Sequence, residues 1–208
     1  YYDFNSNAER GDYETAVKAD QAYESVRRKV AKLIHAKSDG EIVFTANATA
    51  SLNQIAYGLS KQLQPKDVVY ITEGEHASNV LPWFRLQEEL GIEVEYLPVD
   101  EVGKVRLDQI SLKENTKVVS VAEVTNVLGT IQPIKELAQL AHEVGAMMVV
   151  DAAQTIAHHP IDVQDLDVDY ICFSSHKMYG PNGVGVLYGK QALLEALDPM
   201  VLGGGMNA

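Results

Sequence analysis

The sequence predicts an α/β protein with three layers, in which helices flank a mixed, mainly parallel β-sheet. Short apolar runs rich in β-branched residues alternate along the chain with segments of three- and four-residue apolar periodicity. This alternation is typical of parallel strands and their covering helices. Two apolar runs near the end, residues 170–173 and 184–188, are separated by a turn-forming segment. That pair predicts an antiparallel hairpin, which makes the sheet mixed.

The first predicted element is a long helix over residues 13–35. Its apolar residues recur at helical spacing and form one face: Val17, Ala22, Tyr23, Val26, Val30, Leu33 and Ile34. The solvated side is expected to hold Arg27, Arg28, Lys29 and Lys32. Residues 41–45 then predict a strand that runs into small residues and a helix, for which Thr49 or Ser51 is the expected N-cap.

The middle of the chain repeats this strand and helix pattern. Strands are predicted at residues 67–72, 92–97, 117–122 and 146–150, since each run is short, apolar and rich in β-branched residues. Helices are predicted around Trp83 to Leu90 and over residues 134–143, where Gly145 provides a stop. A short helix at residues 191–197 follows the hairpin.

Composition limits the classes of function. The chain has 208 residues, 46% hydrophobic and 22% charged, as in a soluble globular protein with a large core. The net charge of −12 argues against nucleic-acid binding, because no basic field meets the phosphates. No apolar run is long enough to span a bilayer, which argues against a membrane protein.

The single cysteine, Cys172, lies inside an apolar strand. It has no partner for an internal disulfide, and no zinc-binding spacing is present. We therefore expect a buried structural thiol and a reducing compartment, the cytoplasm.

Polar residues gather where the predicted strands end. They are Thr49, His76, Asn126, Asp151, Gln154, Ser174, His176 and Lys177. In open α/β sheets ligands bind beyond the carboxyl ends of the strands, so these residues are expected to share one pocket. Each has a simpler structural explanation: Asp151 could cap a helix, and a lone histidine is more often structural.

Lys177 follows a predicted buried strand and precedes a turn of Gly180, Pro181, Asn182 and Gly183. Most loop lysines are merely solvated. A lysine held by tight turns and partly buried beside His176 can instead lose its proton readily, as a Schiff-base lysine must. Pyridoxal phosphate needs such a lysine, an acidic partner for its ring nitrogen and an anion site for its phosphate. The residues at the strand ends supply all three.

The chain resembles the class V aminotransferase family, most closely its cysteine desulfurase branch of the SufS type, over nearly its whole length. The matching motifs are Asn5-Ser6-Asn7, Glu75-His76 with Asn79 to Trp83, Thr125 to Thr130, Asp151-Ala152-Ala153-Gln154, His158 to Val163, and Phe173 to Pro181. In the phosphate turn Asn47 stands where the family usually has glycine, and asparagine also tolerates positive φ. Ala50 replaces the family's usual glutamate.

The resemblance implies a large domain of the fold-type I pyridoxal-phosphate enzymes and a role for each site residue. Lys177 forms the Schiff base and moves the substrate's α-proton, and Asp151 pairs with the pyridinium nitrogen. Gln154 bonds the phenolic oxygen, and His76 stacks on the ring and takes part in proton transfer. The phosphate is cradled by Ala48, Thr49, Ser174 and His176, and Asn126 helps to hold substrate and cofactor. No metal is implied.

The resemblance also implies the reaction: sulfur removal from L-cysteine, giving alanine and an enzyme persulfide for iron–sulfur assembly. It implies a homodimer and a sulfur-acceptor protein as partners. The family's catalytic cysteine and its carboxylate-binding arginine would lie beyond Ala208, and Cys172 does not match that cysteine. Both chain ends look cut, so we expect a piece of a longer protein. Residues 1–35 would be an N-terminal segment and helix, 36–200 the cofactor-binding domain, and 201–208 the start of a further part.

Two alternatives remain at this point. Another class V activity, such as selenocysteine lysis, β-elimination or epimerisation, would use the same cofactor. A scaffold without cofactor could have kept the same fold.

Overall fold

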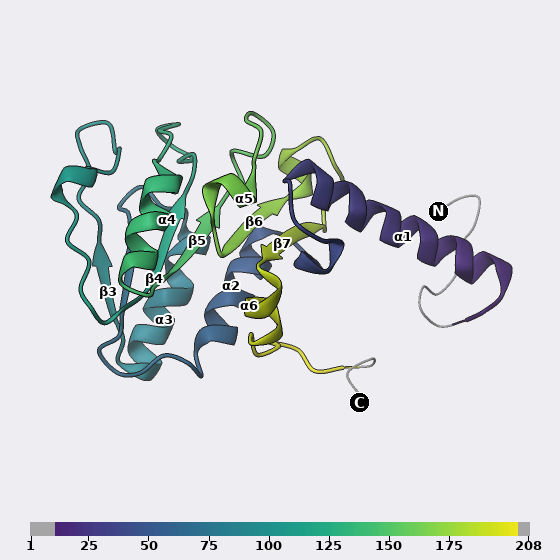
Figure 1. The fold of residues 1–208 in the computed structure, drawn as a ribbon, viewed down its shortest axis with the longest axis horizontal. Helices are drawn as coiled ribbons and strands as arrows, with labels where there is room; N and C mark the ends of the chain where they lie inside the picture. The colour runs from purple at the N-terminus through teal and green to yellow at the C-terminus, as the bar shows by residue number, and fades with distance from the viewer. Residues whose placement is uncertain (1–10, 204–208) are drawn as a thin grey trace.

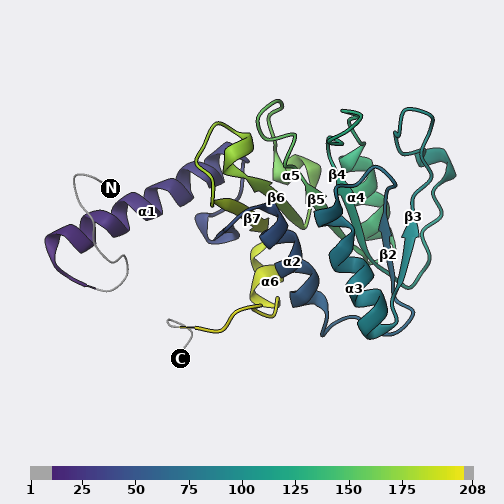
Figure 2. The same ribbon diagram turned by 180° about the vertical axis from the view of Figure 1, so that it is seen from behind.

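The computed structural model describes residues 11–203 and shows a seven-stranded sheet with helices on both faces (Figures 1 and 2). The strands are β1 (Ile42–Thr45), β2 (Val68–Ile71), β3 (Glu93–Tyr96), β4 (Thr116–Ala122), β5 (Met147–Asp151), β6 (Tyr170–Ser174) and β7 (Gly185–Gly189). The helices are α1 (Glu14–Leu33), α2 (Ala48–Leu59), α3 (Leu81–Leu90), α4 (Ile134–Glu143), α5 (Val163–Leu166) and α6 (Gln191–Glu195). The predicted α/β class is confirmed.

The strand order across the sheet is β1-β7-β6-β5-β4-β2-β3. Strand β7 is antiparallel to both of its neighbours, and every other neighbouring pair is parallel. The hairpin is therefore confirmed, with Ser174 of β6 opposite Gly185 of β7. All strands except β7 point the same way, so their carboxyl ends meet at one edge of the sheet.

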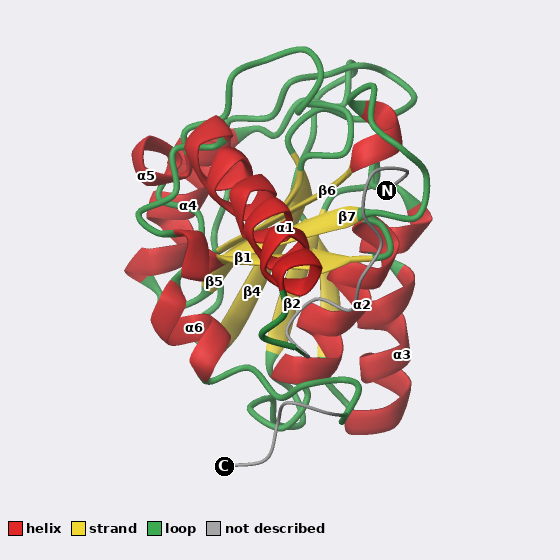
Figure 3. Ribbon diagram, turned by 90° about the vertical axis from the view of Figure 1, so that its right-hand side faces the viewer, coloured by secondary structure: helices red, strands yellow, loops and turns green. Residues whose placement is uncertain are grey.

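The central strands are buried on both faces because successive side chains point to opposite layers. In β5, Met148 and Val150 join the core cluster that contains Leu137 of α4. Between them, Val149 joins the cluster that contains Leu52 of α2. An end-on view shows α4 and α5 on one side of the sheet and α2 and α3 on the other (Figure 3).

Most predicted elements have nearly the expected bounds, and α4 covers residues 134–143 as predicted. Helix α5 was not predicted, because four residues are too few to show a helical period. Within residues 11–203 no helix is long and apolar enough to cross a membrane. Asn5-Ser6-Asn7 and residues 204–208 lie outside the described residues. The division of the chain at residues 35 and 200 stays a prediction.

Helix α1 extends well beyond the sheet (Figure 1), and its last turn packs into the larger core cluster. Ala31 and Ile34 are buried there. The expected apolar face forms, but most of it is exposed: Val17, Tyr23, Val26 and Leu33. The apolar period thus predicted the helix correctly, although the described chain covers only part of this face: Ile34 is buried and Tyr23 packs edge-on against Phe44.

Arg27 corrects one expectation for α1, since it does not belong to a fully solvated side. Its guanidinium lies 5.3 Å from the ring centre of Tyr23 and 5.2 Å from that of Phe44. It also donates a hydrogen bond to the carbonyl oxygen of Ile42. A flat guanidinium with an apolar stem packs well on aromatic faces. Arg27 therefore attaches α1 to β1.

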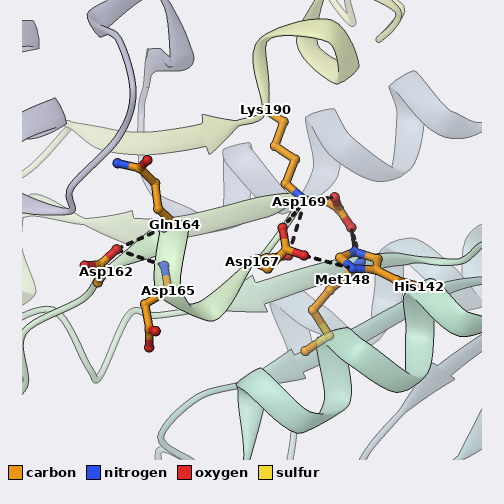
Figure 4. Close-up of polar contacts among 8 residues, drawn as sticks. All are labelled: His142, Met148, Asp162, Gln164, Asp165, Asp167, Asp169 and Lys190. Atoms are coloured by element: carbon orange, nitrogen blue, oxygen red, sulfur yellow. Dashed lines mark hydrogen bonds and ion pairs between the residues drawn. The ribbon is translucent and has the colours of Figure 1, made fainter.

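The edge of the sheet opposite the strand carboxyl ends is held by the buried carboxylate of Asp169 (Figure 4). It accepts hydrogen bonds from His142 Nε2, Lys190 Nζ and the Met148 N–H, each at 2.8 Å. Asp167, which is mostly exposed, contacts the same histidine and lysine. Nearby, Asp162 caps α5 by accepting the Gln164 and Asp165 N–H groups. Asp169 thus joins α4, β5 and β7.

We predict that Asp169→Ala lowers the free energy of unfolding by about 3 kcal/mol, because it leaves a buried N–H, the His142 ring and the Lys190 ammonium without their acceptor. Asp167→Ala removes a contact with the same two partners from an exposed position and should cost less than about 1 kcal/mol. Urea unfolding followed by circular dichroism measures both. Equal losses would contradict the central role of the buried carboxylate.

Candidate active site

A cavity of about 260 Å³ opens at the edge of the sheet where the parallel strands end. Every residue expected at the site lines it: Ala48, Thr49, His76, Asn126, Asp151, Gln154, Ser174, His176 and Lys177. The remaining lining residues are Asn47, Ser78, Ala122, Val124 and Ala153. The parallel arrangement therefore brings together side chains that are far apart in the sequence, although their chemical roles are not tested by this placement.

One wall of the cavity is the start of α2. Its N-cap is Asn47, whose Oδ1 accepts the Ala50 N–H at 2.8 Å, and not Thr49 or Ser51 as expected. Asn47 is extended, with φ −177°, so positive φ does not explain its presence. The presence of asparagine is explained by its side chain, which caps the start of α2.

The first turn of α2 leaves a donor for an anion. The Ala48 N–H bonds Ser174 Oγ at 2.8 Å, which ties the helix to the end of β6. The Thr49 N–H has no acceptor in the described part of the chain. An unpaired N–H at a helix start favours a bound anion, because the helix dipole also presents its positive end there.

Gly185 of β7 permits this wall to form. A Cβ at this position would lie 2.5 Å from the Cα and carbonyl carbon of Asn47. Real side chains essentially never approach a backbone so closely, so only glycine lets β7 pass beside the turn that starts α2.

Asp151 ends β5 at the base of the cavity and is 5% exposed. Its Oδ1 accepts the Ala153 N–H at 2.9 Å, and no helix follows directly, so helix capping does not explain it. Burial raises the pKa of Asp151, and the hydrogen bond from the Ala153 N–H and the positive charge of Lys177 offset part of this rise. A buried carboxylate in this position favours a cationic ligand.

Lys177 follows β6 in a short 3-10 turn, Ser175–Lys177, and is half-buried. The turn expected after it forms at Asn182-Gly183, where Gly183 has φ +81°, and the Gly180 N–H bonds the Ser175 carbonyl oxygen at 2.9 Å. The Lys177 amine makes no hydrogen bond within residues 11–203. It is therefore available to a ligand in the cavity.

The amides of Asn126 and Gln154 likewise make no hydrogen bonds in the described chain. Asn126 lies on the exposed loop after β4, and Gln154 lies half-buried after β5. Both side chains can therefore bind a polar ligand. No group of three or more His, Cys, Asp or Glu side chains among the described residues is placed to hold a metal ion.

Glu75 holds the loop that carries His76, a role that sequence reasoning missed. It accepts hydrogen bonds from Thr72 Oγ1 at 2.6 Å, Asn79 Nδ2 at 2.8 Å and the Ala122 N–H at 2.8 Å. These bonds join the end of β2 to the end of β4. Burial raises the pKa of Glu75 to about 7, against the effect of its three donors.

Ser78 is the second missed residue. It lies between His76 and Thr49 and contacts both side chains. The sequence carries no signal for this contact, because Thr49 is 29 positions away on another element.

Comparison with known proteins agrees with this site. The aminotransferase class V family model matches residues 1–208, so the chain belongs to that family. A probable cysteine desulfurase of Halalkalibacterium halodurans is 43% identical over 99% of this chain and 52% of its own length. The cysteine desulfurase of Synechococcus elongatus is 44% identical over 100% of this chain and 34% of its own length.

Solved structures lead to the same family. The apo structure of cysteine desulfurase from Thermococcus onnurineus superposes with a TM-score of 0.93 at 38% identity, over 97% of this chain and 50% of that one. A cysteine desulfurase from Escherichia coli gives 0.89 at 35% identity, over 99% and 52%. The predicted resemblance is confirmed. The chain spans about half the length, or less, of these relatives.

Glu75 predicts a pH-dependent stability. Between the unfolded pKa of about 4.3 and the folded pKa of about 7, the folded protein holds a proton that the unfolded chain has lost. Stability therefore falls as the pH rises through this window and levels off above it. Glu75→Gln keeps most hydrogen bonds without the charge, so it should be more stable than the parent by about 1–3 kcal/mol above pH 7, with little difference near the unfolded pKa.

Urea unfolding across this pH range measures the difference between Glu75→Gln and the parent protein. Glu73→Gln, which changes an exposed carboxyl two positions away, is the matched control and should shift stability by less than about 0.5 kcal/mol. A difference between Glu75→Gln and the parent that does not vary with pH would contradict the prediction.

Gly185→Ala should lower the free energy of unfolding by about 2–3 kcal/mol, because its new Cβ meets the Asn47 backbone. Gly189→Ala, on the same strand, meets side-chain atoms of Leu194 and Tyr170 at 2.8–2.9 Å and no backbone atom, so it should cost less than Gly185→Ala, about 1–2 kcal/mol. Chemical unfolding of both variants makes the comparison. If Gly185→Ala proves the milder change, the close approach is not a constraint.

Proposed function

We propose that this chain forms the cofactor-binding part of a pyridoxal-phosphate-dependent cysteine desulfurase. The observation that carries the proposal is one cavity that combines the free Lys177 amine, the buried Asp151 carboxylate and the start of α2. Its relatives named cysteine desulfurase, at 43% and 44% identity, support the choice within the family.

The residues present fit the cofactor. Asp151 is a buried carboxylate that favours a cation, as a protonated pyridine nitrogen would be. The unpaired Thr49 N–H, with Ser174 and His176 on the same cavity, suits a phosphate. Gln154 and Asn126 have free amides for the remaining polar groups. Together these residues supply the contacts that the resemblance implies.

When bound, pyridoxal phosphate supplies an aldehyde that condenses with amines and a protonated ring that withdraws electrons from the substrate's α-carbon. Lys177 would provide the amine for that aldehyde, and its Nζ would take the substrate's α-proton. Asp151 would pair with the ring nitrogen and keep it protonated. His76 would stack on the ring and exchange a proton through Nε2, since its Nδ1 is held by Ser78.

Cys172 is not the thiol that accepts the substrate's sulfur. It is 0% exposed inside β6, and burial raises its pKa well above the ordinary value. A thiolate nucleophile needs the opposite environment, accessible and with a lowered pKa. The proposed reaction therefore needs a cysteine other than Cys172, and the resemblance implies that this cysteine and the arginine for the substrate carboxylate would lie beyond Ala208.

The protein is proposed to work in the cytoplasm as a homodimer that passes sulfur to an acceptor protein for iron–sulfur assembly. The exposed apolar face of α1 supports self-association, because such a face is costly in water. The single, unpaired cysteine supports a reducing compartment.

Borohydride reduction of the full-length protein mixed with pyridoxal phosphate should fix the cofactor on Lys177, because this amine is the free one in the cavity. Lys177→Ala should lose both the label and turnover, by at least about 1,000-fold. Lys190→Ala, which removes a lysine at the opposite edge of the sheet, should keep the label. Peptide mapping locates the labelled residue, and sulfide and alanine release from L-cysteine measures turnover.

Each outcome separates the proposal from its rivals. A folded protein without label on Lys177 would overturn the enzyme assignment and favour a scaffold. A labelled protein that releases no alanine from L-cysteine would leave a lyase or an epimerase on the same cofactor.

A further inference from the structure

Ser78 makes three contacts at the edge of the cavity. Its N–H lies 3.1 Å from His76 Nδ1, and its Oγ lies 3.0 Å from the same nitrogen. The same Oγ lies 2.7 Å from Thr49 Oγ1 at the start of α2. A serine that only stabilised its own turn would bond nearby backbone groups, whereas this hydroxyl joins two side chains that line the cavity.

The backbone contact decides where the neutral His76 ring carries its proton. A backbone N–H can only donate, so Nδ1 must offer its lone pair to Ser78. The proton of the neutral ring then lies on Nε2. This nitrogen has no partner in the described chain, so it is the one left for a ligand.

We propose that Ser78 is a positioning residue for the reaction proposed above, holding the His76 ring with its proton on Nε2 and coupling it to the anion position at Thr49. The inference rests on the proposed function, since it assigns a residue that acts through His76.

The coupling follows from the hydroxyl protons. Each hydroxyl has one proton to donate. An anion at the start of α2 takes the Thr49 O–H, which leaves Thr49 Oγ1 as an acceptor for the Ser78 O–H. Ser78 then ceases to donate through Oγ to His76 Nδ1, which keeps only the Ser78 N–H. Filling the anion position thus changes the hydrogen bonding of His76 without moving the backbone.

The test uses full-length protein with ¹⁵N-labelled histidine, without added cofactor, at alkaline pH where imidazoles are neutral. The His76 signals, assigned from their loss in His76→Gln, should show a protonated Nε2 and an unprotonated Nδ1. Inorganic phosphate should shift the Nδ1 signal. Ser78→Ala should reduce that shift at least about threefold, and Ser78→Thr, which restores the hydroxyl, should recover it. Circular dichroism verifies that both variants fold.

The steady-state kinetics of the full-length protein with bound pyridoxal phosphate provide a second measurement. Ser78→Ala should lower kcat about 5- to 20-fold while KM for L-cysteine and the Lys177 label stay unchanged, as expected when only the orientation of His76 is lost. Ser78→Thr should restore most of kcat.

Three results would overturn the proposal: an Nδ1-protonated ring, a phosphate shift that is equal in Ser78→Ala and the parent, or no loss of kcat in Ser78→Ala. Failure of the proposed function is distinguishable, because it appears as an unlabelled Lys177 in the parent protein. The histidine spectra remain interpretable in that case.

Discussion

Asp151 ends the central strand with its carboxylate almost out of contact with water, and it receives one backbone N–H from Ala153. Such a group raises its pKa or gains a cation, because a buried unpaired charge is costly. The surrounding site is arranged accordingly. Lys177 lowers the cost through its positive charge, and both Lys177 and His76 line the same cavity. The site can be understood as a set of partners around one buried carboxylate.

The fold places these partners by strand direction. Ala122 and Asp151 are register partners on β4 and β5, so the chain segment after each strand opens at the same edge. Glu75 binds the Ala122 N–H and fixes the His76 loop to that edge. Gly185 lets β7 pass beside Asn47, which brings the start of α2 to the same place. Together these features fix the distance between the anion position and the carboxylate.

The α/β class, the hairpin and nearly all elements could be predicted from the sequence, because period and turn residues are local signals. The grouping of the site residues at one edge of the sheet could also be predicted, because ligands in open α/β sheets bind beyond the carboxyl ends of the strands. The contacts of Glu75 and Ser78 could not be predicted, since their partners Ala122 and Thr49 are distant in the sequence. The exposure of most of the apolar face of α1 could not be predicted either, because periodicity shows that a face is apolar and does not show what covers it.

The two missed residues share one physical role, which is to fix His76 in place. Glu75 holds the backbone of the loop through three donors, and Ser78 holds the ring through Nδ1. A histidine that is exposed at a cavity would otherwise rotate and exchange tautomers freely. The loop is fixed by the carboxyl group of Glu75, and burial makes the ionised form of this group unfavourable, which raises its pKa to about 7. Glu75 and Asp151 both lie at the edge of the sheet that carries the cavity, where raised carboxyl pKa values are typical of a functional site.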